Sequence, residues 1–324
     1  MCSFCINSES TITVHTRQSR YDPTRTQTLR DAFAREMNRK FRGLQKAIKT
    51  AIIEQDVFGL QSPSMVMLHH GEFLVPSRRA FVFTRSQDKH VAFMDWLRGQ
   101  SERGILELGT FAQLGRPVEQ GWTDLYIQNS YKRGLIRARN EMGKAGLPVP
   151  NLDTTGGISA SMSTPFHIDR VGVLYTRVFE ELKGINNAMS TQISRVLAQG
   201  LVDGDGPAFL AEKLNAVISG HRLGELGLTD TLGRFIPAQR RAQILARTEI
   251  IRAHHVGMVQ EYRNWNVVGV KVQAEWRTAG DGRVCGECAS MEGQVFTLEQ
   301  IENMIPRHPQ CRCIAIPTMP EKKV

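Results

Sequence analysis

The sequence predicts a mainly α-helical N-terminal region with long helices, followed by an α+β C-terminal module with a small sheet and a Cys/His cluster. Three observations predict this fold class. Apolar residues recur every three or four positions over long stretches of the N-terminal region, which is the spacing of one helix face. One stretch near the C-terminus alternates apolar and polar residues, as a strand does. Four of the six cysteines fall between Cys285 and Cys313.

The composition is that of a basic globular protein. The 324 residues include 41 Lys and Arg against 32 Asp and Glu, a formal net charge of +9. This excess favours polyanionic partners such as nucleic acid, although it is equally typical of a merely basic protein. No apolar run approaches the roughly 20 residues that span a bilayer, and the N-terminus lacks a secretory signal. We therefore expect folding in a reducing cytoplasm, where clustered thiols bind metal or catalyse rather than form disulfides.

Composition shifts along the chain predict the domain organisation. The N-terminal tail holds Cys2 and Cys5 at a metal-binding spacing, but two thiols cannot close a tetrahedral site, so we expect a disordered tail. A stretch rich in Gly, Pro, Ser and Thr predicts a linker or exposed loop. The predicted parts are a flexible basic tail (1–28), a mostly helical N-terminal domain (29–145), a linker or exposed loop (146–166), a helical plus α+β domain (167–317) and a C-terminal tail (318–324).

The first long helix is predicted from Leu29 to Ile52, where apolar residues step by three or four. Its opposite face is basic, and two interpretations stay open: a solvated surface, or a surface that contacts DNA or an acidic partner. The basic residues of this face are Arg30, Arg35, Arg39, Lys40, Arg42, Lys46 and Lys49.

Further elements follow the same signals of periodicity, proline and glycine. The predictions in chain order are a short strand at 80–84, a helix from Ser86, a helix over 122–142, a long helix from Val171 to Gly200, a short helix between Pro207 and Gly220, and a long helix from Pro237. The alternating stretch Val268–Trp276 is the main strand of the C-terminal module. Thr297 and Gln300 then form a capping-box pattern that begins a short helix.

The cysteine cluster is the strongest chemical signal. Cys285 and Cys288 form C-x2-C, and His308, Cys311 and Cys313 form H-x2-C-x-C. Thiolate and imidazole ligands on two short turns suit a structural Zn2+ site, and the segment has few large apolar residues of its own. The preferred ligands are the four cysteines, with His308 replacing one of them or supporting the site from outside. Metal-free thiols, a disulfide formed outside the cell and a catalytic thiol paired with His308 remain alternatives.

Residues 237–317 closely resemble the phage Mu F-like minor head protein domain. In that family a helix with R-T-E-x-x-R leads into W-x-[ST]-x-x-D-x-R-x-C-x-x-C, and the domain ends on H-P-x-C-R-C. The matching residues are Arg247, Thr248, Glu249 and Arg252, then Trp276, Asp281, Arg283, Cys285 and Cys288, then His308, Pro309, Cys311, Arg312 and Cys313.

The resemblance implies a non-enzymatic minor capsid protein of a tailed phage that acts in head morphogenesis. It implies binding to the portal protein inside the head near the portal vertex, help in assembly and DNA packaging, and in some members ejection with the DNA. Expected partners are the portal, a major capsid or scaffold protein and packaged double-stranded DNA bound without sequence preference. No membrane is expected in the assembled head, and assembly would take place in the host cytoplasm. Two other functions stay open: a Cys- or metal-dependent DNA-processing or proteolytic enzyme, and a sequence-independent DNA-binding accessory protein.

Overall fold

The computed structural model describes residues 11–13, 22–60, 66–67, 73–74, 86–113, 116–147, 157–222, 226, 236–267 and 269–320. The chain divides into two compact units, each assembled from separated segments. Unit 1 comprises Met1–Ala34, Trp122–Val178 and Ile244–Val324, and unit 2 comprises Arg35–Gly121 and Phe179–Gln243. The sequential domain boundaries predicted from composition stay a prediction.

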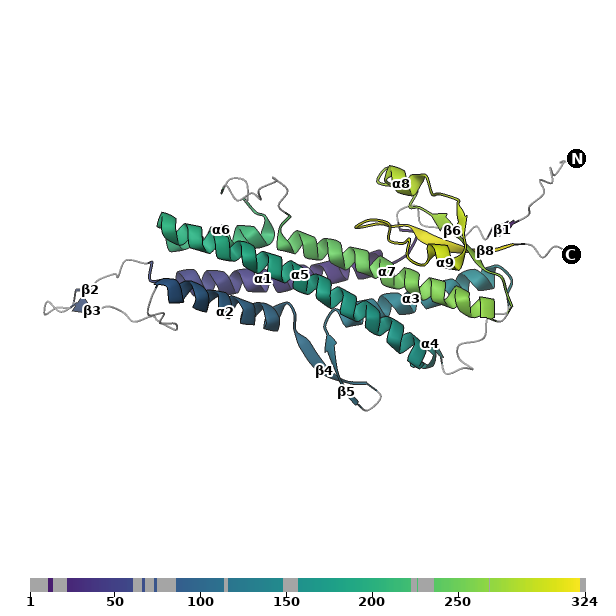
Figure 1. The fold of residues 1–324 in the computed structure, drawn as a ribbon, viewed down its shortest axis with the longest axis horizontal. Helices are drawn as coiled ribbons and strands as arrows, with labels where there is room; N and C mark the ends of the chain where they lie inside the picture. The colour runs from purple at the N-terminus through teal and green to yellow at the C-terminus, as the bar shows by residue number, and fades with distance from the viewer. Residues whose placement is uncertain are drawn as a thin grey trace, which may run out of the picture. The chain divides into compact units, whose positions relative to one another are not determined.

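Unit 2 is mainly helical (Figure 1). The predicted apolar stripe of the first helix is confirmed, because its seven residues from Leu29 to Ile52 are all at most 9% exposed. The elements that contribute to this unit are α1 (Gln27–Lys49), a π-helical turn (Thr50–Glu54), β2 (Val66–Met67), β3 (Phe73–Leu74), α2 (Ser86–Gly104), β4 (Leu108–Gln113), β5 (Arg116–Gly121), α5 (Pro165–Asp203), α6 (Pro207–Ser219) and the start of α7 (Ala238–Val267).

Polar side chains form hydrogen bonds between pairs of helices in unit 2. Asn38 on α1 accepts hydrogen bonds from Gln239 and Gln243 on α7, at 3.0 and 2.6 Å. His90 on α2 lies 3.1 Å from the hydroxyl of Ser194 on α5. The antiparallel β4–β5 hairpin, which no sequence pattern predicted, interrupts the helices of this unit.

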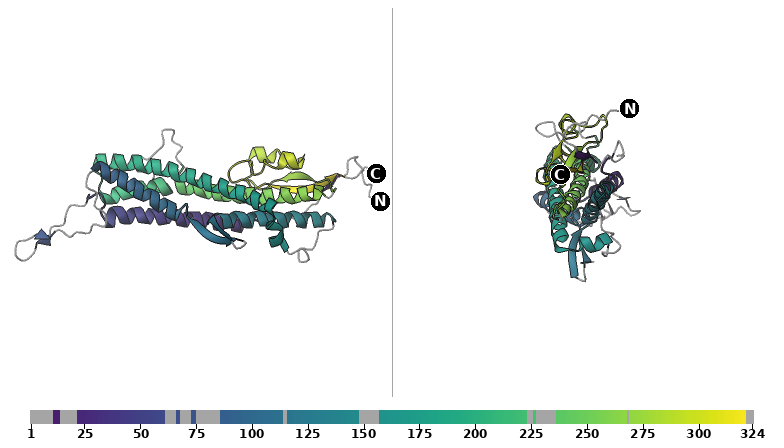
Figure 2. Two further views of the ribbon diagram at one scale, coloured as in Figure 1. Left: turned by 60° about the horizontal axis from the view of Figure 1, so that its bottom comes forward. Right: turned by 90° about the vertical axis from the view of Figure 1, so that its right-hand side faces the viewer.

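Unit 1 combines helices with a four-stranded antiparallel sheet of order β1-β8-β6-β7. Figures 1 and 2 show this sheet and α9 lying along the C-terminal part of α7. The fully buried Trp276 and Tyr262 belong to the core between them. The remaining elements of this unit are β1 (Thr11–Thr13), α3 (Asp124–Lys144), α4 (Gly157–Met162), β6 (Gln273–Arg277), α8 (Gly286–Ala289), β7 (Val295–Phe296), α9 (Leu298–Ile301) and β8 (Ile314–Pro320).

Two glycines let α3 and α7 approach closely. A Cβ atom at Gly134 would lie 2.1 Å from the carbonyl oxygen of His254, and a Cβ atom at Gly257 would lie 2.4 Å from that of Tyr131. The hydroxyl of Ser130 donates a hydrogen bond to the Ile250 carbonyl at 2.6 Å across the same contact. The backbones of the two helices therefore touch where neither carries a side chain.

The main strand of the C-terminal module differs from its prediction. The strand begins at Gln273 and not at Val268, which lies outside the described residues, because α7 continues to Val267 and Gly269 turns the chain with a φ of +89°. The longest strand is β8, which was not predicted. Its residues Ile314–Ile316 are all buried, so they show no alternation of apolar and polar residues.

Other predictions fall partly outside the described residues. The strand predicted at 80–84 and the pair Cys2 and Cys5 lie there. Of the predicted linker 146–166, the described part includes α4 and the start of α5. Within the described residues, none of the helices combines the length and the apolar character that crossing a bilayer requires.

Candidate metal centre

Separate turns bring the cysteine cluster together in unit 1. Cys285 caps the N-terminus of α8, where its sulfur accepts a hydrogen bond from the backbone N–H of Cys288 at 3.4 Å. His308 follows α9, and Cys311 and Cys313 directly precede β8. Cys288, Cys311 and Cys313 are at most 4% exposed. All five predicted side chains belong to one Cys/His cluster.

The ligand atoms form two groups that share Cys288. Cys285, Cys288 and His308 form one group, and Cys288, Cys311 and Cys313 form the other. Within each group the sulfur and ring nitrogen atoms all lie within 4.8 Å of one another. This chemistry, with thiols and an imidazole and without a carboxylate, is that of a site for a metal such as zinc.

Three separations between ligand atoms, two in the first group and one in the second, agree with the edges of a metal-centred tetrahedron. The Nε2 atom of His308 lies 3.4 Å from the sulfur of Cys285 and 3.3 Å from that of Cys288. The Cys288 and Cys311 sulfurs are 4.0 Å apart. Ligands at zinc bond lengths of about 2.0–2.3 Å in a tetrahedron are separated by about 3.5 Å for sulfur and nitrogen and about 3.8 Å for two sulfurs. Cys285, Cys288 and His308 can therefore share one ion, and Cys311 can join them only after its side chain moves, because it is grouped with Cys288 and Cys313 and not with Cys285 and His308.

A second contact orients His308. Its Nδ1 atom lies 2.8 Å from the Pro309 carbonyl oxygen, which can only accept a hydrogen bond, so Nδ1 carries the hydrogen and Nε2 keeps its lone pair. This nitrogen is the one that faces Cys285 and Cys288. Metal-binding histidines are commonly fixed in this way by a carbonyl on the far side of the ring.

The thiols shift one another's pKa values in opposite directions. A hydrogen bond from Cys313 lowers the pKa of Cys311, and the same contact raises the pKa of Cys313. Burial raises the pKa of Cys288, and the neighbouring Cys311 adds to this effect. Without a cation, the cluster therefore favours one thiolate among protonated neighbours, and a bound dication would remove the cost of ionising the others.

An ion pair between residues that are not themselves ligands links the two turns that carry the cysteines. Asp281, in the turn before the first cysteine pair, accepts two hydrogen bonds from the guanidinium of Arg312 at 2.6 and 2.7 Å. Arg312 lies between Cys311 and Cys313, so this pair ties together the two ligand-bearing turns. The Arg312 hydrogen bonds hold the pKa of Asp281 well below its usual range, and the backbone N–H of Arg283 adds to the effect.

We expect Asp281→Asn to lower the melting temperature at neutral pH. A carboxylate with a depressed pKa in the folded state contributes stability above its unfolded pKa and loses it as pH falls through the folded value. The difference between wild type and variant should therefore persist through mildly acidic pH and shrink only in strong acid. Melting curves from pH 7 downward check this, and an Asp281→Asn melting temperature equal to that of wild type at pH 7 would contradict it.

The helix motif residues hold the second ligand turn against α7. The backbone N–H of Gln310 donates to the Thr248 hydroxyl at 3.0 Å, and Arg247 donates to the Gln310 side chain at 3.3 Å. Glu249 pairs with Arg252, one turn further along α7, at 3.2 Å. Glu249 is itself buried and also pairs with Arg177 of α5 at 3.4 Å, a partner that no sequence pattern indicated.

The C-terminal module is fixed to the helices by a second set of contacts. Arg263 on α7 makes two hydrogen bonds to Glu302 at 2.6 and 2.7 Å, and Arg170 on α5 reaches the same carboxylate at 3.3 Å. His255 on α7 is buried, and its Nε2 lies 2.9 Å from the Ile301 carbonyl oxygen.

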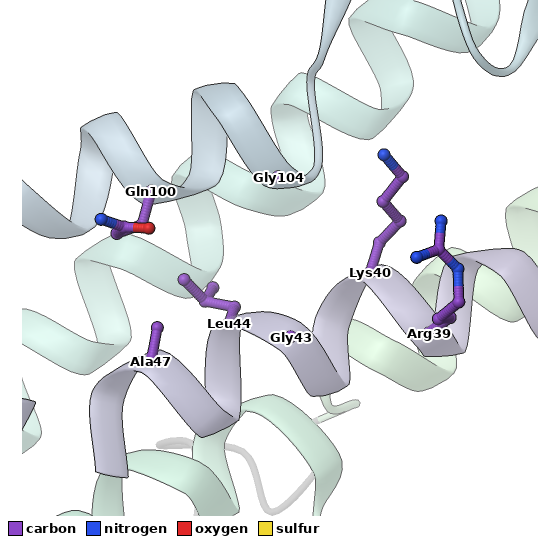
Figure 3. A pocket seen from close by; sticks show the side chains of 7 residues that line it. All are labelled: Arg39, Lys40, Gly43, Leu44, Ala47, Gln100 and Gly104. Atoms are coloured by element: carbon purple, nitrogen blue, oxygen red, sulfur yellow. The ribbon is translucent and has the colours of Figure 1, made fainter. Parts of the chain in front are cut away.

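The basic face of α1 divides into exposed and structural residues. Arg30 is 8% exposed and pairs with Asp22 at 2.8 Å, so its assignment to an external contact surface was wrong. Arg30 lies in the first turn of α1, so its side chain reaches Asp22 in the segment that precedes the helix. Lys40 pairs with Glu107, and Figure 3 shows it extending from α1 toward the end of α2, on the rim of a small groove. The exposed remainder, called the basic stripe below, is Arg35, Arg39, Arg42, Lys46 and Lys49.

The fold and the site together define a helical protein with a small sheet module held by a Cys/His cluster. Residues 191–316 match the family described as Phage Mu protein F like protein. This part of the chain is therefore similar to that family, which confirms the resemblance and extends it upstream of residue 237. Searches of the curated proteins and of the solved structures gave no significant match.

Proposed function

We propose that this protein is a minor head protein of a tailed phage that binds the portal inside the head and aids assembly and DNA packaging. One observation carries the proposal. The family's motif residues, which are scattered from Arg247 to Cys313 in sequence, lie together in one connected structure around the cysteine cluster. They contact one another and the helix α7, which is the arrangement expected of a structural module.

Quantitative mass spectrometry of purified phage particles tests this role. We expect a few copies of the chain per particle, and co-purification with the portal after the head is disrupted. Measurement before and after DNA release determines whether the chain leaves with the DNA. Particles that contain no copy of the chain would contradict the proposal.

The cluster is proposed to bind a structural Zn2+ through Cys285, Cys288, His308 and Cys311. Three separations between their ligand atoms, Cys285–His308, Cys288–His308 and Cys288–Cys311, support this set, and so does the orientation of His308. Cys313 would then support Cys311 from outside the metal shell. Four protein ligands leave no open position for a substrate, so such an ion would stabilise the module and not catalyse.

One observation favours the alternative of a catalytic thiol. Cys285 is partly exposed, its hydrogen bond from the Cys288 backbone lowers its pKa, and its sulfur lies 3.4 Å from His308. A reactive thiolate beside an imidazole would be alkylated rapidly. Iodoacetamide labelling of the purified chain separates the two functions, because a zinc-bound thiolate with three other protein ligands should react slowly until a chelator removes the ion.

The basic stripe is proposed to contact packaged DNA or the portal. Its residues step by four, three, four and three positions, which places them on one face of α1. All five are exposed, and this repeated positive charge suits a row of phosphates better than a specific base sequence.

Reversing the charge of Arg35, Arg39 and Arg42 to Glu should weaken binding to double-stranded DNA. If each residue neutralises one phosphate, the slope of log affinity against log salt should become shallower by about 0.9 for each arginine that is reversed. Binding is measured by fluorescence anisotropy at several salt concentrations. The matched control reverses three exposed cations elsewhere in unit 2, namely Arg98, Lys183 and Arg222. Equal weakening in both triple variants would show a general charge effect and contradict a specific role for the stripe.

A further inference from the structure

A pocket at the C-terminal end of α3 in unit 1 is lined by four cations and by none of the cysteines. It has a volume of about 520 Å3, which is within the range of small-ligand sites. Most of its lining comes from the last two turns of α3. The side chains that line it, called the arginine pocket below, are Arg25, Arg137, Arg139, Asn140, Glu141 and Lys144.

The acids near this pocket are too few to balance its cations. Glu141 is fully buried and pairs with Arg137 at 2.6 Å and with Lys144 at 3.6 Å. Arg139 pairs with Glu261 at 2.8 Å. Arg25 is exposed and forms no ion pair within the part of the chain that the structure describes. Four cations against two carboxylates leave a local excess of two positive charges.

Arg137 is the least satisfied of these residues. Its side chain is only 7% exposed, its Nε lies 2.6 Å from a Glu141 oxygen, and its two terminal guanidinium nitrogens have no hydrogen-bond partner among the described residues. Burial lowers the pKa of Arg137, and the positive charge of Arg25 adds to this effect. A buried cation with unused donors is costly unless another negative group comes near. An anion in the pocket would supply one.

We propose that the arginine pocket binds a phosphate group. Arg25, Lys144 and Asn140 are exposed and can donate hydrogen bonds to it, while Arg137 adds charge from beneath. A phosphate offers several acceptor oxygens, and guanidinium groups match its geometry with two parallel hydrogen bonds. A phosphate monoester carries nearly two negative charges at neutral pH, which matches the local excess. The carbonyl end of α3 opposes an anion, but the four cations outweigh that partial charge.

The phosphate could come from two sources, free inorganic phosphate or the end or backbone of a DNA strand. Both sources present the same phosphate oxygens to the arginine pocket. Binding of this group does not depend on the proposed role in head morphogenesis. The volume of the pocket exceeds what one phosphate ion fills, so a sugar attached to the phosphate also has room.

Isothermal titration calorimetry on the full-length chain tests the proposal with inorganic phosphate at constant ionic strength. We expect saturable binding by wild type, and binding weaker by at least about tenfold in the double variant Arg25→Gln and Lys144→Gln, since two charge-assisted hydrogen bonds are removed. Both side chains are exposed, so the variant should melt like wild type. The matched control, Arg98→Gln with Lys183→Gln, removes two exposed cations of unit 2 that lie outside the basic stripe and should bind phosphate normally.

A second titration distinguishes free inorganic phosphate from the phosphate of a DNA strand. Short duplexes with and without a 5′-phosphate are titrated into wild type and both double variants. Loss of phosphate binding alone in the pocket variant supports a free phosphate ligand, and a matching loss of duplex binding supports DNA. Phosphate binding that is absent in wild type, or unchanged in the pocket variant, would overturn the proposal.

Discussion

The Cys288→Ser variant is expected to lose its metal and to melt far below wild type. Cys288 is shared by both ligand groups and is only 2% exposed, so no other thiol can take its place. A structural zinc site contributes on the order of 10 kcal/mol to folding, which is comparable with the whole stability of a domain. The module between α7 and β8 should therefore unfold in this variant, while the helices of unit 2 keep their circular dichroism signal.

Cys313→Ser is the matched control for this experiment. Cys313 is nearly as buried as Cys288 but lies outside the proposed ligand set. We expect it to retain one metal ion per chain, measured by inductively coupled plasma mass spectrometry, and to melt much closer to wild type. A Cys288→Ser variant that keeps both its metal and its melting temperature would contradict the account. Metal loss in Cys313→Ser with retention in His308→Ala would instead assign the site to the four cysteines.

Gly257→Ala is expected to cause the second large loss of stability. The new Cβ would lie 2.4 Å from a backbone carbonyl of α3, and backbone cannot rotate away as a side chain can. The two helices must separate, which weakens the packing around Tyr131 and the hydrogen bond from Ser130. We expect a loss of about 3 kcal/mol in the free energy of unfolding, measured by urea denaturation.

Gly172→Ala is expected to raise the free energy of unfolding. Gly172 lies inside α5, where a Cβ would meet nothing within 4 Å. Alanine there should stabilise the chain by about 0.5–1 kcal/mol, because glycine is the poorer helix former. If the two variants instead change the free energy of unfolding by the same amount and in the same direction, helix propensity alone explains both changes. This result would contradict the close contact of α3 with α7.

Local patterns predicted local structure well. The apolar stripe of α1 is buried as its spacing indicated, since one helix determines which of its residues share a face. The capping box of Thr297 and Gln300 is present with both of its hydrogen bonds, because it depends on residues three apart. The convergence of the cysteines was also predicted, because thiols and a histidine on short turns share a preferred geometry around one ion.

Contacts between distant segments were the part that the sequence could not predict. Arg30 carries the same charge as its neighbours on α1, and only the turn at Asp22 makes it a buried residue. The strand predicted from Val268 exists, but it begins only at Gln273. The helix α7 extends to Val267, and a turn separates it from the strand. The arginine pocket joins residue 25 to the end of α3, and no spacing in the sequence relates those segments.

X-ray absorption at the zinc edge of the purified full-length chain tests the central claim most directly. The account predicts one zinc ion per chain, with three sulfur neighbours at about 2.3 Å and one nitrogen neighbour at about 2.0 Å. A chain that is folded without zinc, or whose zinc is surrounded mainly by oxygen, would contradict it.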